Sequence, residues 1–241
     1  MGAWKYQAQL ADRGSEETQF WQEPTSGHAT RRPGHRNNTT ARGFTPFNDV
    51  VVYHESELEH RVSTLLQART DVDELHSQFP VMAYLDADNV QRAHTFDYFV
   101  VLRSGRRVAI TVKQFKKRAK MHLLLEQVRQ SGMLVRNAHN EFRSGFVDDL
   151  ALITDVDANM DAFLNASDIL RARDFYNRED HAELLDQVQH FPGRFRFGEL
   201  FRNCTYQARR WTAAWALIEH GNIRPFQPGR ISDVSWMTVA R

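Results

Sequence analysis

"HTFDYFVVLRSGRRVAITVK", residues 94–113, contains two apolar runs separated by a short polar stretch with one glycine. Runs of Val, Ile and aromatic residues bounded by turn residues are typical of β-strands, so this stretch predicts a hairpin that turns at residues 103–106. A hairpin brings the far ends of its two strands together. Asp97, at the start of the first strand, and Lys113, at the end of the second, are therefore expected to lie side by side.

A helix is expected before the hairpin. Apolar side chains recur at three- and four-residue spacing from Leu58 to Leu66, which gives a helix one buried face. Ser56 is a preferred N-cap residue, and Glu59 three positions later completes a capping-box pattern. The helix should therefore present Glu59 in its first turn.

The segments around the hairpin complete an α/β pattern. Residues 72–85 are expected to be extended, and Pro80 favours an edge position. Residues 116–132 have the spacing of a helix that ends at Gly132, and residues 148–156 read as a buried strand. The order helix, three strands, helix and strand predicts an α/β fold in which helices flank a mixed sheet.

The C-terminal part is predicted to be a separate module. Residues 178–191, 195–203 and 205–221 read as three helices, and residues 222–239 as two strands around Pro228-Gly229. Three helices and a β-hairpin predict a winged-helix-like domain.

The N-terminal part is poor in aliphatic residues, and residues 26–48 contain four arginines and no acid. One interpretation is a mobile arm with too little apolar surface to offset chain entropy. The other is an arm that contacts DNA phosphates, with Arg31 and Arg32 among the contacting residues. The expected organisation is a basic arm (1–48), an α/β domain (49–160) and a winged-helix-like domain (161–241).

Composition limits the class of protein. The 241 residues are 41% hydrophobic and 25% charged, which is ordinary for a globular protein, and no apolar run is long enough to span a membrane. The first residues lack the apolar core of a secretory signal, and the single cysteine fits a reducing cytoplasm. The net charge is only +1, so any affinity for nucleic acid must come from local patches.

The expected neighbours of the hairpin suit one chemistry. Breaking a phosphodiester bond needs a divalent metal held by oxygen ligands and a cation near the scissile phosphate. Glu59 from a helix, Asp97 from one strand and Lys113 from the next would supply these groups. The alternative is an ordinary hairpin with charged ends.

Five motifs resemble the TnsA-like transposon endonucleases, which belong to the restriction-endonuclease-like PD-(D/E)xK nucleases. They are Ser56-Glu57-Leu58-Glu59, Gln78-Phe79-Pro80, Phe96-Asp97, Gly105-Arg106 and Thr111-Val112-Lys113. The stretch "DLALITD" and residues 195–221 also resemble the later strand and the winged-helix half of such proteins. The resemblance covers roughly residues 50–240 and implies a restriction-endonuclease-like mixed sheet, flanked by helices, with a C-terminal winged helix.

The resemblance also implies roles for single residues. Glu59 and Asp97 would hold Mg²⁺ or Mn²⁺, Thr111 stands at the third ligand position, and Lys113 would orient the attacking water. The family carries Gln, Glu or Asp where this chain has Thr111. Three explanations stay open: a second metal held largely by backbone and water, an acid displaced to Glu126, or lost catalysis.

Two sets of basic residues are candidates for DNA contact. Four follow Lys113 at the start of the expected helix, where cations oppose the helix dipole: Lys116, Lys117, Arg118 and Lys120. Arg209 and Arg210 fall near the supposed recognition helix of the winged-helix module. For both sets the alternative is an ordinary solvated surface.

The expected function is a metal-dependent endonuclease subunit of a transposition system that cuts one strand of double-stranded DNA at transposon ends. A partner transposase and an ATP-using regulator are implied by the resemblance, with a cytoplasmic, DNA-associated location. Two alternatives stay open: an inactive nuclease fold that binds DNA or a partner, and a winged-helix transcriptional regulator.

Overall fold

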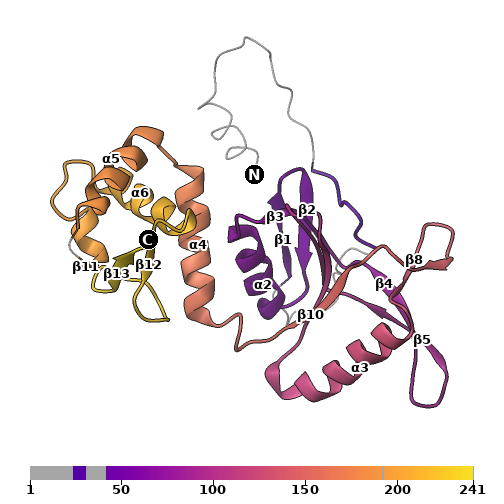
Figure 1. Cartoon of the computed structure of the whole chain (residues 1–241). Helices are drawn as coiled ribbons and strands as arrows, with labels where there is room; N and C mark the ends of the chain where they lie inside the picture. Colours follow the sequence, from indigo (N-terminus) through magenta and orange to yellow (C-terminus); the bar gives the residue numbers. More distant parts are fainter. Residues whose placement is uncertain (1–23, 31–41, 192, 241) are drawn as a thin grey trace, which may run out of the picture. The chain divides into compact units, whose positions relative to one another are not determined.

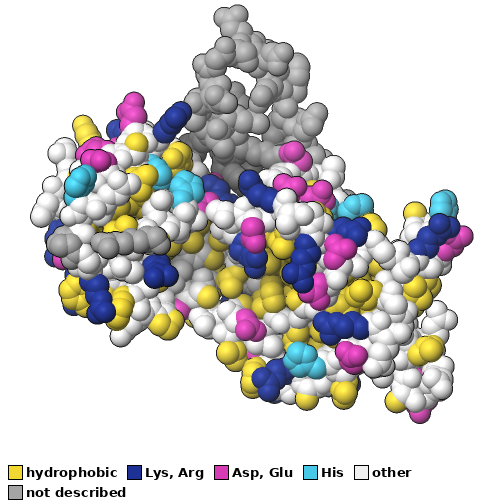
Figure 2. Space-filling view, viewed as in Figure 1, with side chains coloured by type: hydrophobic (Ala, Val, Ile, Leu, Met, Phe, Trp, Pro, Cys, Tyr) yellow, Lys and Arg dark blue, Asp and Glu magenta, His cyan; other side chains and the backbone are white. Residues whose placement is uncertain are grey.

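The computed structural model describes residues 24–30, 42–191 and 193–240. They fall into two compact units: the N-terminal unit ends at Asn159, and the C-terminal unit begins at Met160. The described residues form a mixed α/β protein with four sheets and five α-helices. None of the described helices combines the length and apolar composition needed to cross a bilayer. On the face seen in Figure 2, basic and acidic side chains are interspersed, in keeping with the net charge of +1. Arg31 and Arg32 lie outside the described residues.

The N-terminal unit contains nearly all the strands. Its helices are α2 (Glu57–Ala68) and α3 (Arg118–Gln130), and a 3-10 turn, η1 (Phe115–Lys117), precedes α3. Its strands are β1 (Gly43–Phe47), β2 (Val50–His54), β3 (Val72–Ser77), β4 (Val81–Leu85), β5 (Gln91–Thr95), β6 (Tyr98–Leu102), β7 (Arg107–Val112), β8 (Leu134–Arg136), β9 (Phe142–Arg143) and β10 (Asp149–Ile153).

The main sheet has the strand order β10-β7-β6-β3, with β10 parallel to β7 and the other pairs antiparallel (Figure 1). The expected hairpin is confirmed, since β6 and β7 pair from Tyr98↔Ile110 to Val101↔Arg107. Helices α2 and α3 cover opposite faces. Val62 of α2 packs in a core with Tyr98 and Ile110, whereas Leu125 of α3 packs in a second core with other residues of the same strands. The α/β class predicted from the sequence is confirmed.

Two of the expected strands are each split between two sheets. Residues 72–85 form β3 and β4, and the expected strand before the turn forms β5 and β6; β4 and β5 belong to a second sheet, β5-β4-β8-β9. The two breaks face each other: the N–H of Gln78 donates to the carbonyl of Asp97 at 2.8 Å, and that of Phe96 to Pro80 at 2.9 Å. The chain therefore leaves one sheet and enters the other at the same place on both passes.

The expected arm is partly wrong. Residues 43–47 form β1, which pairs with β2 from Gly43↔His54 to Phe47↔Val50. Further upstream, the N–H of Val51 donates to the carbonyl of Thr25 at 2.7 Å. These are backbone bonds, which do not require the aliphatic side chains whose scarcity suggested a mobile arm.

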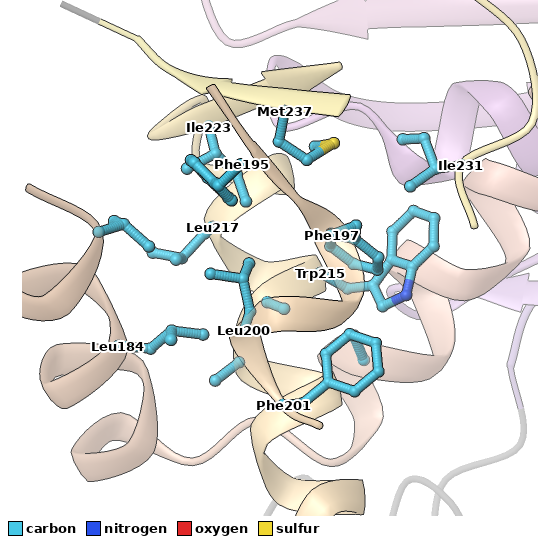
Figure 3. Close-up of a cluster of buried hydrophobic side chains, with 14 residues drawn as sticks. Leu184, Phe195, Phe197, Leu200, Phe201, Trp215, Leu217, Ile223, Ile231 and Met237 are labelled. Carbon is cyan, nitrogen blue, oxygen red and sulfur yellow. The ribbon is translucent and has the colours of Figure 1, made fainter. Parts of the chain in front are cut away.

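The C-terminal unit has three helices and one small sheet. Its elements are α4 (Met160–Asp174), α5 (Arg178–Gln189), β11 (Arg194–Arg196), the 3-10 turn η2 (Phe197–Leu200), α6 (Gln207–Glu219), β12 (Ile223–Pro225) and β13 (Trp236–Val239). The antiparallel sheet has the order β11-β13-β12. Figure 3 shows the core, in which Phe197, Trp215 and Met237 are almost wholly buried.

Three expectations for this unit can be compared with the structure. The helix that ends near Gly221 is confirmed as α6, and the two C-terminal strands are confirmed as β12 and β13. The helix expected at residues 195–203 is wrong, because that segment is β11 and η2. Its alternation of Arg194, Phe195 and Arg196 has the period of a strand, with only the phenylalanine buried. Helix α4 was not expected.

One ion pair ties the start of β7 to the segment before β10. Arg107 donates to Asp148 Oδ2 from its backbone N–H at 2.8 Å and to Oδ1 from its guanidinium at 2.9 Å, and the Asp148 N–H returns a bond to the Arg107 carbonyl. These bonds, the guanidinium bond first, lower the pKa of the Asp148 carboxyl from 3.8 to about 2.

We therefore predict a pH-dependent stabilisation from Asp148. A carboxyl whose pKa is lowered in the folded state stabilises the fold above its unfolded pKa, and the effect is lost as pH falls through the folded value. Asp148→Asn should lower the melting temperature at neutral pH, with the difference from wild type shrinking below about pH 4 and vanishing near pH 2. Thermal unfolding from neutral to acid pH measures this, with the exposed Asp88→Asn as control. A difference that is constant with pH would contradict it.

Candidate functional site

Three donors from the end of β7 converge on one carboxylate oxygen. Thr111 Oγ1 lies 3.2 Å from Asp97 Oδ2, the Val112 N–H donates to it at 2.7 Å, and Lys113 Nζ lies 3.2 Å away. The predicted neighbourhood of Asp97 and Lys113 is thus confirmed. Thr111 and Lys113, two positions apart in the chain, both reach this same oxygen.

Backbone bonds fix this cluster from three directions. The Asp97 N–H donates to the Ile110 carbonyl at 3.0 Å, and the Asp97 carbonyl accepts from Gln78. The Lys113 N–H donates to the carbonyl of Ile153, the last residue of β10, at 3.1 Å. Asp97 therefore sits at the point where the chain changes sheet, held against the last residues of β7.

Asp97 and Thr111 are both buried. Asp97 is only 9% exposed, and Thr111 is fully buried. Thr111 alternates along β7 with Ile110 and Val112, which pack under α2, so its side chain lies on the opposite face of the sheet. Within the described residues, no hydrogen bond reaches Asp97 Oδ1.

Glu59 lies in the first turn of α2, as the capping pattern predicted. Ser56 is the N-cap and its hydroxyl accepts from the Glu59 N–H, while the Glu59 carboxylate accepts from the Ser56 hydroxyl at 3.0 Å and the Glu55 N–H at 2.7 Å. Burial raises the pKa of the Glu59 carboxyl, and the nearby Asp97 carboxylate adds to the rise, whereas the bond from Glu55 opposes it.

A buried tyrosine attaches α2 to the sheet at this point. The Tyr98 hydroxyl donates to the Glu59 carbonyl at 2.9 Å. Tyr98, the first residue of β6, follows Asp97 directly in the chain, so neighbouring residues position both carboxylates. Burial, with the charge of Glu59 as a second cause, raises the pKa of the Tyr98 hydroxyl well above 10, which keeps it a neutral donor.

His94 is a member of the cluster that the sequence did not single out as a site residue. Burial lowers the pKa of its imidazole, and the charges of Asp97 and Lys113 act on it in opposite directions. Its Nε2 is buried and has no hydrogen-bond partner among the described residues. Histidines in this chain lack metal-ligand spacing, and only the pairing of β5 with β4 places His94 here.

Carboxylates are the groups here that could contribute to a metal site. Among the described residues, no group of three or more His, Cys, Asp or Glu side chains is placed to hold a metal ion. Mg²⁺ commonly uses one or two carboxylates and keeps several waters. Asp97 and Glu59 are the two carboxylates that the sequence motifs nominate for such a role.

Glu126 is not part of the cluster. It is exposed on α3, where its contacts are with Gln130 and Arg129 of the same helix. Arg129 in turn donates to the carbonyl of Leu150, near the start of β10, whereas the cluster lies at the end of that strand. A carboxylate displaced from the Thr111 position to Glu126 is therefore not supported.

A basic surface begins directly after Lys113. We define the η1 basic cluster as Lys116, Lys117, Arg118 and Lys120, all exposed and without an ion pair to another described residue. The Phe115 N–H donates to Asp155, and the Arg118 guanidinium lies 4.5 Å from the Phe115 ring centre. Asp155 thus anchors the turn that carries these cations.

Arg209 and Arg210 are engaged within their own unit. Arg209 Nε lies 2.6 Å from Asp180, and Arg210 Nη2 lies 2.6 Å from Glu183, so both join α6 to α5. The structure therefore gives these two arginines a packing role and brings neither into a free basic surface.

The role of Thr111 is open to a direct test. In Thr111→Glu, a second carboxylate is placed beside Asp97 in a buried site, and without metal this should lower stability by about 3 kcal/mol. Mg²⁺ or Mn²⁺ should raise the melting temperature of this variant more than that of the wild type, because a ligand that binds only the folded state stabilises it. Thr111→Val, which adds no charge, is the control and should show no added response. Equal metal responses in all three proteins would show that position 111 is not beside a cation site.

No family model matches the chain, and no curated protein matches it either. The function must therefore be inferred from the side chains themselves.

Proposed function

We propose that the N-terminal unit is a metal-dependent nuclease domain that cuts DNA. The observation that carries the proposal is the contact of Asp97 with Lys113 at one end of the main sheet, with the Glu59 carboxylate of α2 near enough for the Asp97 charge to act on it. The order α2-β3-β6-β7-α3-β10, with β10 parallel to β7, also agrees with the restriction-endonuclease-like sheet that the motifs imply.

Each group has a definite task in this proposal. A divalent cation bound at Glu59 and Asp97 would polarise the scissile phosphate and lower the pKa of bound water. Lys113 Nζ, between Asp97 Oδ2 and the Val112 carbonyl at 2.9 Å, would stabilise negative charge that develops on the phosphate oxygens. Asp97, with three donors on one oxygen, keeps the lysine in place.

The η1 basic cluster supports DNA as the substrate. Its four cations follow Lys113 within a few residues and form no ion pair with another described residue. Positive charge at a helix N-terminus is unfavourable unless an anion compensates it. Phosphates on either side of the scissile bond would provide that compensation.

The C-terminal unit fits a winged-helix-like arrangement within the same proposal. Its first strand, β11, pairs with the last, β13, and the helices cover one face of the sheet. A subunit that nicks transposon ends together with a transposase and an ATP-using regulator is the biological role that the motif resemblance suggests.

An inactive nuclease fold that grips DNA is the second candidate. Thr111 favours it, because a neutral, fully buried hydroxyl that already bonds Asp97 leaves less negative charge to hold a cation. Metal-dependent cleavage distinguishes the two candidates.

Cleavage of supercoiled plasmid with Mg²⁺ or Mn²⁺ tests the proposal. The wild type should convert supercoiled to nicked circles, and Lys113→Ala should slow this by about 10²-fold or more, because it removes a charge that stabilises the transition state. Arg143→Ala, an exposed arginine paired with Glu141 in the same unit, is the control and should cleave normally. Absence of metal-dependent cleavage in the wild type, with DNA binding intact, would support the inactive fold.

The salt dependence of binding tests the η1 basic cluster. Replacing Lys116, Lys117, Arg118 and Lys120 by Gln should reduce the slope of log affinity against log salt by about 3 to 4, since each phosphate contact contributes about 0.9. The charge-matched control replaces four exposed arginines of the same unit by Gln: Arg92, Arg103, Arg136 and Arg143. Equal slopes for the two variants would mean that only net charge matters.

A further inference from the structure

The small sheet of the C-terminal unit has one buried and one exposed face. Phe195 and Met237 are paired across β11 and β13 and lie in the core, as Figure 3 shows, and Ile223 of β12 lies there too. Side chains of the neighbouring positions must point to the other face, because successive residues of a strand alternate. The described helices α4, α5 and α6 contribute to the same core and therefore pack against the buried face.

Arginines and aromatic rings occupy this exposed face. Arg194 and Arg224 both stand opposite Thr238, and Arg196 stands opposite Trp236. The N–H of Phe226, directly after β12, donates to the Trp236 carbonyl at 2.8 Å, which places it at the same end of the sheet. We call Arg194, Arg196, Arg224, Phe226 and Trp236 the arginine–aromatic face.

Two of the guanidinium groups lie over aromatic rings. The Arg194 guanidinium carbon is 3.3 Å from the centre of the Phe226 ring, and that of Arg196 is 3.8 Å from the centre of the Trp236 ring. Phe226 and Trp236 both remain 43% exposed, so these large aromatic side chains are still accessible to a ligand. Arg196 also donates to the Val234 carbonyl.

The positive charge of this face is not compensated. Arg194, Arg196 and Arg224 have no ion pair with another described residue. Five other described arginines of the unit each pair with a carboxylate: Arg171 and Arg230 with Asp168, Arg173 with Glu219, Arg209 with Asp180 and Arg210 with Glu183. Asp233, the acid that precedes β13, packs against Gly198 of η2.

Stacked arginines are well suited to phosphates. A guanidinium that lies on a ring keeps its N–H donors at its edge, and the ring restricts its rotation, so less entropy is lost when an anion binds. Strand geometry places the Cα atoms of Arg194 and Arg196 roughly 7 Å apart and those of Arg194 and Arg224 roughly 10 Å apart. The three cations can therefore contact several phosphates in succession and not one isolated anion.

We infer that the arginine–aromatic face binds the phosphate backbone of DNA, as a second contact surface separate from the cleavage cluster. The inference rests on the proposed function only in taking DNA as the ligand. The inference assigns DNA contact in the C-terminal unit to its small sheet. Arg209 and Arg210 of α6, which the sequence suggested for this contact, are instead ion-paired with residues of α5. An acidic peptide would be attracted by the same charge, and the experiment separates the two.

The experiment measures binding of the full chain to a fluorescent 20-base-pair duplex over a salt series, in EDTA so that no cleavage occurs. Arg194→Gln/Arg224→Gln should reduce the log–log salt slope by about 2. Its affinity deficit should consequently grow about tenfold as salt falls from about 200 to about 50 mM. Arg171→Gln/Arg178→Gln, in which two exposed arginines of α4 and α5 are removed, should keep the wild-type slope.

Two further measurements make the result decisive. Arg194→Lys/Arg224→Lys should keep the slope but bind more weakly, because lysine keeps the charge and loses the stacked fork. Melting temperatures of the variants at Arg194 and Arg224 should match that of the wild type, since the face is exposed. Equal slopes for the two Gln variants would overturn the inference. It would also be overturned if Arg194→Gln/Arg224→Gln lost binding to a polyglutamate peptide while binding the duplex normally, which would indicate an acidic protein partner.

The two proposals can fail separately. A reduced salt slope for Arg194→Gln/Arg224→Gln, without plasmid cleavage by the wild type, would support the arginine–aromatic face and contradict the nuclease activity. Plasmid cleavage by the wild type, with an unchanged salt slope for this variant, would support the nuclease activity and contradict the arginine–aromatic face.

Discussion

The carboxylate of Asp97 is the group on which the N-terminal unit depends. Its Oδ2 accepts the Val112 N–H, which is buried at the end of β7, and it also lies against Thr111 and Lys113. A buried backbone N–H without a partner is costly, so the carboxylate completes the sheet where the main-chain ladder stops. The ion pair with Lys113, the end of the β6–β7 pairing and the change from one sheet to the other all involve this residue.

The sequence predicted the parts of the site that depend on local pattern. The hairpin follows from two short apolar runs and a turn, and the position of Glu59 follows from Ser56 three residues before it. Each signal lies within about twenty residues, where a strand period or a capping rule is enough. The contact between α2 and β6 also depends on the hydrogen bond from the Tyr98 hydroxyl to the Glu59 carbonyl. No sequence pattern predicts a bond from a tyrosine to the carbonyl of a distant helix.

Other features depend on contacts between distant segments. The Gln78 N–H donates to the Asp97 carbonyl where both strands break, and β4 and β5 continue from there in a second sheet. The apolar pattern of the sequence does not change at these two positions, so it does not predict the breaks. His94 reaches the cluster by that route. The helix expected at residues 195–203 is absent for a different reason. Arg194, Phe195 and Arg196 alternate between exposed and buried with the period of a strand.

The capping of α2 has a consequence for any cation that binds here. Both oxygens of Glu59 already accept bonds, from Glu55 and Ser56, so a metal must share this carboxylate with the helix N-terminus. Occupancy and local helix order are then thermodynamically linked, and each changes the free energy of the other by the same amount. The Glu55 N–H donates to the Glu59 carboxylate, so the rate of hydrogen exchange at the Glu55 amide should change when a cation binds that carboxylate.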